Sequence, residues 1–157
     1  MNRNLTTREA TVADVPTIVR HRRAMFESMG MLDPARNDAM DAAATAYLAK
    51  AIPRGEYRGW LVETPSGEVI AGAGLSIMQR VSTPYNLSGQ FAYLMSLYVE
   101  PGYRRQGIAR HLMRTMIAWS VAQGITDITL HASEQGRPLY DSLGFEPTTE
   151  MRLLIDR

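Results

Sequence analysis

A strand turns into a helix within the segment Leu97-Tyr98-Val99-Glu100-Pro101-Gly102-Tyr103-Arg104-Arg105-Gln106-Gly107-Ile108-Ala109. Its start is apolar, and Pro101-Gly102 is typical of a turn that ends a strand. Gly107 then opens a helix, whose first backbone N–H groups have no partner within the helix and lie at the positive end of its dipole. With Arg104 and Arg105 beside them, these groups predict a phosphate-binding turn, in which Gly107 lets the phosphate approach the backbone closely.

The same segment excludes the two commonest nucleotide-binding motifs. No Gly-Lys-Ser/Thr follows the turn, and the Gly-x-Gly-x-x-Gly spacing of a dinucleotide site is missing. The chain also has no cysteine, which removes disulfides, thiolate metal sites and cysteine nucleophiles. Because His21, His111 and His131 lack metal-ligand spacing, we expect no metal.

The flanking sequence predicts a mixed α/β fold in a single domain, residues 1–157. Thr11 and Asp14 predict a capping box at the start of the first helix. Periodicity and turn residues predict helices at 13–28, 38–51, 107–123 and 136–143, and strands at 5–9, 59–63, 68–78, 91–99, 125–131 and 151–155. The early strands read as antiparallel, and 91–131 reads as a β-α-β crossover.

Charge and hydropathy limit the partners. Seventeen Lys and Arg face sixteen Asp and Glu, and this balance argues against nucleic acid and against a charged membrane surface. No apolar run approaches the ~18 residues of a membrane-spanning helix. Residues 1–7 are polar and lack the apolar core of a signal peptide. We therefore expect a soluble, cytoplasmic protein without nucleic-acid or membrane partners.

Two motifs together resemble a known family. Arg104-x-x-Gly107-x-Ala109 resembles the pyrophosphate motif of the GNAT superfamily of acyl-CoA-dependent N-acetyltransferases. Downstream, Leu139-Tyr140-Asp141-Ser142-Leu143-Gly144-Phe145 is similar to that family's Leu-Tyr-x-x-Leu-Gly-Phe helix. The resemblance spans about residues 91–145. It implies a central, twisted, mixed and mostly antiparallel sheet of about six to seven strands, flanked by about four helices, with a splayed strand pair for CoA.

The resemblance also implies where acetyl-CoA, the co-substrate, binds. Backbone groups of one splayed strand would pair with the pantetheine arm, and the turn would hold the pyrophosphate. Ser133 either binds pantetheine or caps the last helix, and Arg137 either reaches a CoA phosphate or lies in water. The cofactor-binding residues implied in this way are Leu97, Tyr98, Val99, Arg104, Arg105, Gln106, Gly107, Ile108, Ala109, Ser133 and Arg137.

Tyr140 matches the family's recurrent general acid. A phenol and a thiol have pKa values of about 10 and about 8.5, close enough for proton donation to a leaving thiolate. The alternative is a core aromatic residue.

The general base stays open, because strand 91–99 contains no carboxylate. Two alternatives remain for the base: a water molecule held near Tyr93 or Ser96, and Glu27 on the first helix. Glu100 is interpreted as a surface residue, and His131 as part of the strand packing.

The acceptor side of the family is built from the first two helices and the loop before the long strand. This implies candidate acceptor-binding residues Met25, Phe26, Glu27, Met29 and Tyr93, with core packing as the alternative for the methionines. Arg20, Arg22 and Arg23 form a basic helix face, which either is solvated or meets an anionic group of the acceptor or of a neighbouring subunit.

Together these features predict an N-acetyltransferase that moves acetyl from acetyl-CoA to a primary amine of a small molecule or peptide. Direct attack in a ternary complex is favoured, because no cysteine can carry the acetyl group. The alternative is a catalytically silent acyl-CoA-binding sensor or regulatory domain. Single-domain members often dimerise, so monomer and homodimer both stay open.

Overall fold

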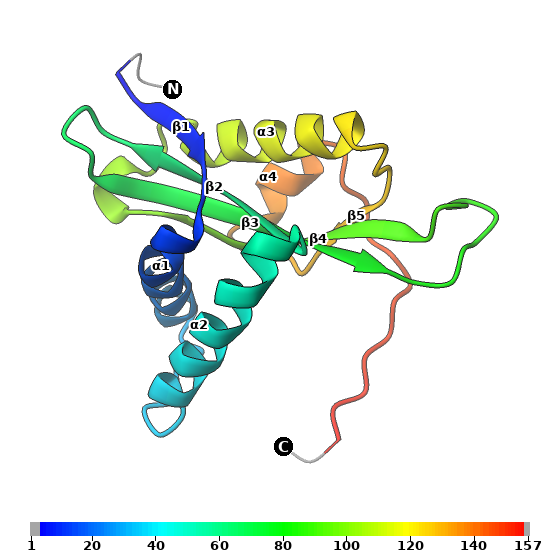
Figure 1. The fold of residues 1–157 in the computed structure, drawn as a ribbon, viewed down its shortest axis with the longest axis horizontal. Helices are drawn as coiled ribbons and strands as arrows, with labels where there is room; N and C mark the ends of the chain where they lie inside the picture. The colour runs from blue at the N-terminus through cyan, green and yellow to red at the C-terminus, as the bar shows by residue number, and fades with distance from the viewer. Residues whose placement is uncertain (1–3, 156–157) are drawn as a thin grey trace.

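A five-stranded sheet with the order β1-β2-β3-β4-β5 forms the centre of the computed structural model, which describes residues 4–155 (Figure 1). The strands are β1 (Thr6–Glu9), β2 (Tyr57–Glu63), β3 (Val69–Gln79), β4 (Gln90–Val99) and β5 (Ile128–Leu130). The first four pair antiparallel, and β5 is parallel to β4. The predicted mixed fold and the β-α-β crossover are confirmed.

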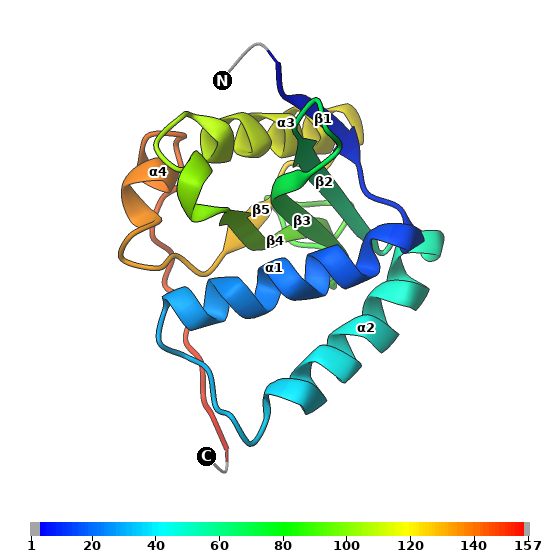
Figure 2. The same ribbon diagram turned by 90° about the vertical axis from the view of Figure 1, so that its left-hand side faces the viewer.

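Helices cover both faces of the sheet (Figure 2). The helices α1 (Val15–Ser28) and α2 (Asn37–Arg54) lie on one face. The other face carries α3 (Ile108–Ala122) and the short α4 (Arg137–Asp141). α2 extends past the predicted end at residue 51, because Pro53 lies in the last turn and removes only one backbone hydrogen bond there. Each layer has its own apolar core against the sheet.

The strand count is lower than predicted. Residues 151–155 form no strand, and the side chains of Met151, Leu153 and Ile155 are 93%, 82% and 77% exposed. The apolar pattern there predicted a strand, but a strand also needs a neighbour with free backbone groups, and in the described chain this segment extends away from the sheet (Figure 1). The predicted strand 125–131 shortens to Ile128–Leu130 for a similar reason, since its pairing with β4 ends at Leu130.

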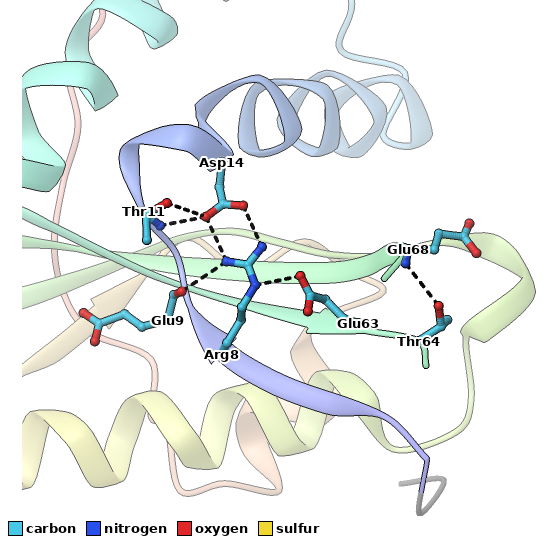
Figure 3. A network of polar contacts seen from close by, with 7 residues as sticks. All are labelled: Arg8, Glu9, Thr11, Asp14, Glu63, Thr64 and Glu68. Carbon is cyan, nitrogen blue, oxygen red and sulfur yellow. Dashed lines mark hydrogen bonds and ion pairs between the residues drawn. The ribbon is translucent and has the colours of Figure 1, made fainter. Parts of the chain in front are cut away.

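An ionic network joins β1, β2 and the entry to α1 (Figure 3). Arg8 donates to both carboxylate oxygens of Asp14 at 2.8 and 2.7 Å and to Glu63 at 2.6 Å. The backbone N–H of Thr11 donates to Asp14 at 2.8 Å, which completes the predicted capping box. These hydrogen bonds, first of all those from Arg8, lower the pKa of Asp14 to about 2. The network therefore fixes where α1 begins relative to the sheet.

Candidate active site

The turn after β4 adopts the conformation that anion binding requires. Pro101–Tyr103 forms a single 3-10 turn, and Gly107 precedes α3 with a left-handed φ of 80°. Arg105 also has a positive φ, 63°, and its side chain is exposed. Arg104 is exposed too, with Nε donating to the carbonyl of Val99 at 3.0 Å. The two guanidinium groups therefore flank the turn.

Several backbone N–H groups of this turn have no acceptor. Within residues 4–155, the N–H groups of Gln106 and Gly107 donate to no backbone or side-chain oxygen. The N–H groups of Ile108 and Ala109 belong to the first turn of α3, where no helical carbonyl is available. These four residues and the two arginines provide the donors and positive charge that a pyrophosphate needs.

β4 and β5 separate beyond Leu94. Their pairing runs only from Ala92 opposite Ile128 to Leu94 opposite Leu130. Farther along, Tyr98 and Val99 pair with β3, so their other side faces no strand within residues 4–155. The separation begins at a β-bulge, where Ser96 has a φ of 58° and the β3–β4 register shifts. The predicted splayed strand pair is present, and Leu97 to Val99 lie along its open edge.

α4 places Tyr140 in the core near the same region. The residue is 8% exposed and belongs to the apolar cluster that includes Leu94 and Ile108. Its ring packs edge-on against Phe145 at 5.9 Å between centroids. Burial raises the pKa of the Tyr140 hydroxyl, so the group stays protonated at neutral pH. Within the described residues this hydroxyl has no hydrogen-bond partner, which leaves its proton free for a ligand.

The two remaining cofactor candidates lie at the start of α4. The hydroxyl oxygen of Ser133 accepts from the N–H of Gly136 at 3.1 Å and so closes the turn that leads into this helix, whose N-cap is Gly136, while the Ser133 proton stays available to a ligand. Arg137 is exposed, 4.0 Å from the carboxylate of Asp141. Arg110 of α3 donates to Ser142 at 2.8 Å and ties the end of α4 to the helix that follows the turn.

A cavity of about 600 Å³ lies between α1, α2 and the strands β3 and β4. Its volume falls within the ~300–1,000 Å³ range of small-molecule sites. Tyr93, Met95 and Ser96 of β4 form one wall, so the cavity meets the point where β4 and β5 separate. Its lining residues are Ile18, Arg22, Met40, Ala43, Ala44, Tyr47, Leu48, Tyr57, Ser76, Met78, Tyr93, Met95 and Ser96.

Of the predicted acceptor residues, the structure brings only Tyr93 to the cavity. Met25 and Phe26 are half-buried, whereas Glu27 and Met29 are exposed near the end of α1. The reason is helical geometry: Ile18 and Arg22, four residues apart, face the cavity, and Phe26 continues this stripe beyond it. The Arg22 guanidinium covers the Phe26 ring at 4.9 Å.

The three arginines of α1 have different surroundings. Arg20 pairs with Glu100 at 2.7 Å, and Arg23 pairs with Asp38 and Asp41, both at 2.7 Å. Arg22 has no carboxylate within 4.0 Å among residues 4–155 and donates instead to Ser96 Oγ at 3.1 Å. The sequence identified the basic helix face, but only the ion pairs show which of its members is free to meet an anion.

The structure also distinguishes between the candidates for the general base. Burial alone would raise the pKa of Glu100, but hydrogen bonds from Arg20 and Tyr98 outweigh it and hold that pKa below its usual value. Glu100 is therefore occupied in an ionic cluster. In the cavity wall, the hydroxyl of Tyr93 contacts Nδ1 of His131, a residue that the sequence assigned to packing. Residues 4–155 contain no His, Asp or Glu cluster with the geometry of a metal site.

No helix among residues 4–155 is both long and apolar enough to span a bilayer. Among these helices, α3 begins at the predicted phosphate-binding turn, and α1 and α2 enclose the cavity.

Comparison with known proteins agrees with this geometry. Residues 21–145 match the model of the acetyltransferase (GNAT) family, so the chain belongs to that family. A GCN5-related N-acetyltransferase from Ralstonia eutropha JMP134 has a similar structure, with a TM-score of 0.89 and 35% identity over 96% of this chain and 98% of that one. A predicted acetyltransferase from Clostridium acetobutylicum, crystallised with acetyl-CoA, gives a TM-score of 0.88 and 27% identity over 96% of both chains.

Two curated relatives match over shorter segments. Glucosamine 6-phosphate N-acetyltransferase of Trypanosoma brucei brucei is 28% identical over 90 residues, 57% of this chain and 59% of that protein. Aminoglycoside N(6')-acetyltransferase type 1 of Acinetobacter genomosp. 13 is 37% identical over 60 residues, 36% of this chain and 41% of that protein. The matched segments thus span about half the length of these relatives.

Proposed function

We propose that the chain transfers an acetyl group from acetyl-CoA to a primary amine, by direct attack within a ternary complex. The observation that carries this proposal is that one strand, β4, borders both the cavity and the turn proposed to bind the pyrophosphate. β4 forms a cavity wall at Tyr93 to Ser96, separates from β5 at the same place, and leads after Val99 into the anion-binding turn. One ligand lying along the open edge of β4 would join the two.

The residues that would hold acetyl-CoA fit its chemistry. The free N–H groups from Gln106 to Ala109 match the pyrophosphate, and Arg104 and Arg105 supply charge. The backbone of Leu97 to Val99 offers an unpaired edge to the amide groups of pantetheine. Ser133 would donate to pantetheine, and Arg137 would reach a phosphate. Acetyl-CoA supplies an activated acyl group as a thioester.

The reaction then needs two proton transfers. The neutral amine attacks the thioester carbonyl, a C–N bond forms, and the C–S bond breaks. Tyr140, whose raised pKa keeps the hydroxyl protonated at neutral pH, gives its proton to the thiolate as the C–S bond breaks. The attacking nitrogen loses its proton to a water molecule held near Tyr93 and Ser96, both of which line the cavity. Glucosamine 6-phosphate and aminoglycosides, the acceptors in the names of the two curated relatives, are primary amines of the class proposed.

Thiol release from acetyl-CoA tests the proposal. The purified chain is mixed with acetyl-CoA and a panel of primary amines, and CoA thiol and N-acetylated product are quantified together. We expect equal amounts of both with at least one amine. Binding of acetyl-CoA without amine-dependent release would contradict catalysis and indicate the sensor alternative. The absence of acetyl-CoA binding in calorimetry would contradict both.

A further inference from the structure

The lining of the cavity consists mainly of apolar side chains and tyrosine rings, with two serines and one charged side chain. Ile18, Met40, Ala44 and Leu48 belong to α1 and α2, and the opposite wall adds further methionines and the rings of tyrosines. Two of the hydroxyl groups satisfy each other, since Tyr47 and Ser76 lie 3.1 Å apart. No Asp, Glu, Lys or His is among the lining residues. A ligand here gains most by burying a large apolar group.

Arg22 is the single charged group of that lining. Its side chain is partly buried, and among residues 4–155 it has no carboxylate partner, whereas its neighbours Arg20 and Arg23 both do. A guanidinium in such a place favours a carboxylate, which it can bind with two parallel hydrogen bonds. The same charge disfavours a polycation in the cavity, because none of the lining residues is acidic.

Arg22 also lies where the reaction would occur. Nη1 is 3.1 Å from the hydroxyl of Ser96, the residue at the β-bulge where β4 and β5 separate. An acceptor whose carboxylate binds Arg22 must therefore carry its amine close to that carboxylate to reach a thioester at the separation. The apolar part of the acceptor then extends toward α2 and β3.

From these three observations we infer that the acceptor is an α-amino acid with a large apolar side chain, bound by its carboxylate to Arg22. The inference deepens the proposed acetyl transfer and rests on it. Polyamines and aminoglycosides are disfavoured by charge, because both would carry several ammonium groups into a cavity whose lining residues include no carboxylate. Amino sugars are disfavoured because their hydroxyls would face Ile18, Ala44 and Leu48 without hydrogen-bond partners.

A matched pair of amines tests the role of the carboxylate. L-Phenylalanine and phenethylamine share the same aromatic body and amine, but only the first has the carboxylate. For the wild-type chain we expect kcat/KM to be at least about tenfold higher with phenylalanine, the size of a charge-assisted hydrogen bond. Spermidine, kanamycin and glucosamine 6-phosphate should be far poorer acceptors than phenylalanine.

Variants of α1 assign the effect to one side chain. Arg22→Gln should lower the ratio of kcat/KM for phenylalanine to kcat/KM for phenethylamine about tenfold or more, mainly through a higher KM for phenylalanine. Arg23→Gln is the control, because it removes an adjacent arginine whose partners are Asp38 and Asp41. Arg23→Gln should leave the ratio of kcat/KM for phenylalanine to kcat/KM for phenethylamine unchanged.

A second variant tests the apolar part independently. Ala44 lines the cavity from α2, so Ala44→Leu should reduce its volume. We expect the ratio of kcat/KM for phenylalanine to kcat/KM for alanine to fall, while the KM for acetyl-CoA is unchanged.

Three results would overturn the inference. These are equal kcat/KM for phenylalanine and phenethylamine, a higher kcat/KM for spermidine or kanamycin, and no transfer to phenylalanine. Transfer to a polyamine would leave the proposed acetyltransferase function intact. A chain that binds acetyl-CoA but acetylates no amine would remove the function itself.

Discussion

The hydroxyl of Tyr93 in β4 contacts Nδ1 of His131, which lies just beyond β5. The two residues therefore bridge the strands next to their separation, and Tyr93 also lines the cavity between α1, α2, β3 and β4. Burial raises the pKa of Tyr93, so its hydroxyl stays protonated and can donate to His131. In the proposed reaction, this pair would hold the water molecule that accepts the amine proton.

We expect Tyr93→Phe to lower kcat about tenfold and to shift the acidic limb of the pH–rate profile, because the water loses a partner. His131→Asn should have a similar effect, and the double variant should be no worse than either single one. Steady-state kinetics from pH 6 to 9 measures this. Tyr85→Phe is the control, since Tyr85 is 97% exposed. Additive losses would show that the two residues act separately.

Gly107 allows a prediction about acetyl-CoA in which the loss of stability has a matched control. Gly107→Val introduces a β-branched residue at a φ of 80°, which costs stability and also places carbon atoms where phosphate must approach. Gly124→Val at the other end of α3 has a comparable strain, with a φ of 74° and no atom near the new Cβ. We expect similar melting temperatures for the two variants but at least about tenfold weaker CoA binding only for Gly107→Val. Calorimetry that finds equal affinities would contradict the anion-binding role of the turn.

Tyr140→Phe should lower kcat about ten- to a thousandfold and leave the KM for acetyl-CoA nearly unchanged, because the proton is needed only as the C–S bond breaks. The fold should stay within about 1 kcal/mol of the wild type, since the hydroxyl has no hydrogen-bond partner in the described residues. Kinetics at several pH values with a thermal melt as control measures both. An unchanged kcat would show that Tyr140 has only the packing role.

His21 predicts a loss of stability at mildly acidic pH. Its ring is 2% exposed, and burial, with the nearby charge of Arg20, lowers its pKa from 6.5 to about 4. As the pH falls below 6.5, His21 binds a proton in the unfolded chain but not in the folded chain. The contribution of neutral His21 to the free energy of unfolding is therefore fully present above pH 6.5 and decreases toward pH 4. The expected loss is about 3 kcal/mol. Urea unfolding from pH 7 to pH 4 should show a smaller dependence of stability on pH for His21→Phe than for the wild type.

The ionic network of Arg8 and Asp14 predicts a second loss, at lower pH. The pKa of Asp14 falls from 3.8 to about 2, so the contribution is complete above pH 3.8 and is lost as the pH falls toward 2. Arg8→Ala should cost about 2 kcal/mol at pH 7, and this difference from the wild type should shrink below pH 3.8. Arg58→Ala removes an exposed pair with Glu9 and should cost less than about 1 kcal/mol. A constant Arg8→Ala effect across that range would show that packing, rather than charge, causes it.

Much of the molecule could be predicted from sequence because it depends on residues close together in the chain. The turn from Pro101 to Gly107, the start of α3 and the short helix that carries Tyr140 all follow from local signals: proline, glycine and apolar spacing. The same motifs indicated the family, which the match over residues 21–145 establishes. The single-domain boundary, the oligomeric state and the roles of individual site residues stay predictions.

Features that join distant parts of the chain required the tertiary structure. The mostly apolar residues 151–155 favour a strand, but no neighbouring strand lies beside them in the described chain. Arg20, Arg22 and Arg23 look alike in sequence, yet carboxylates from Glu100, Asp38 and Asp41 neutralise two of them and leave Arg22 at the cavity. Tyr93 and His131 meet only because β4 and β5 are neighbours. In each case the interaction free energy depends on which side chains the fold brings within a few ångströms of each other. That distance cannot be read from the spacing of residues along the chain.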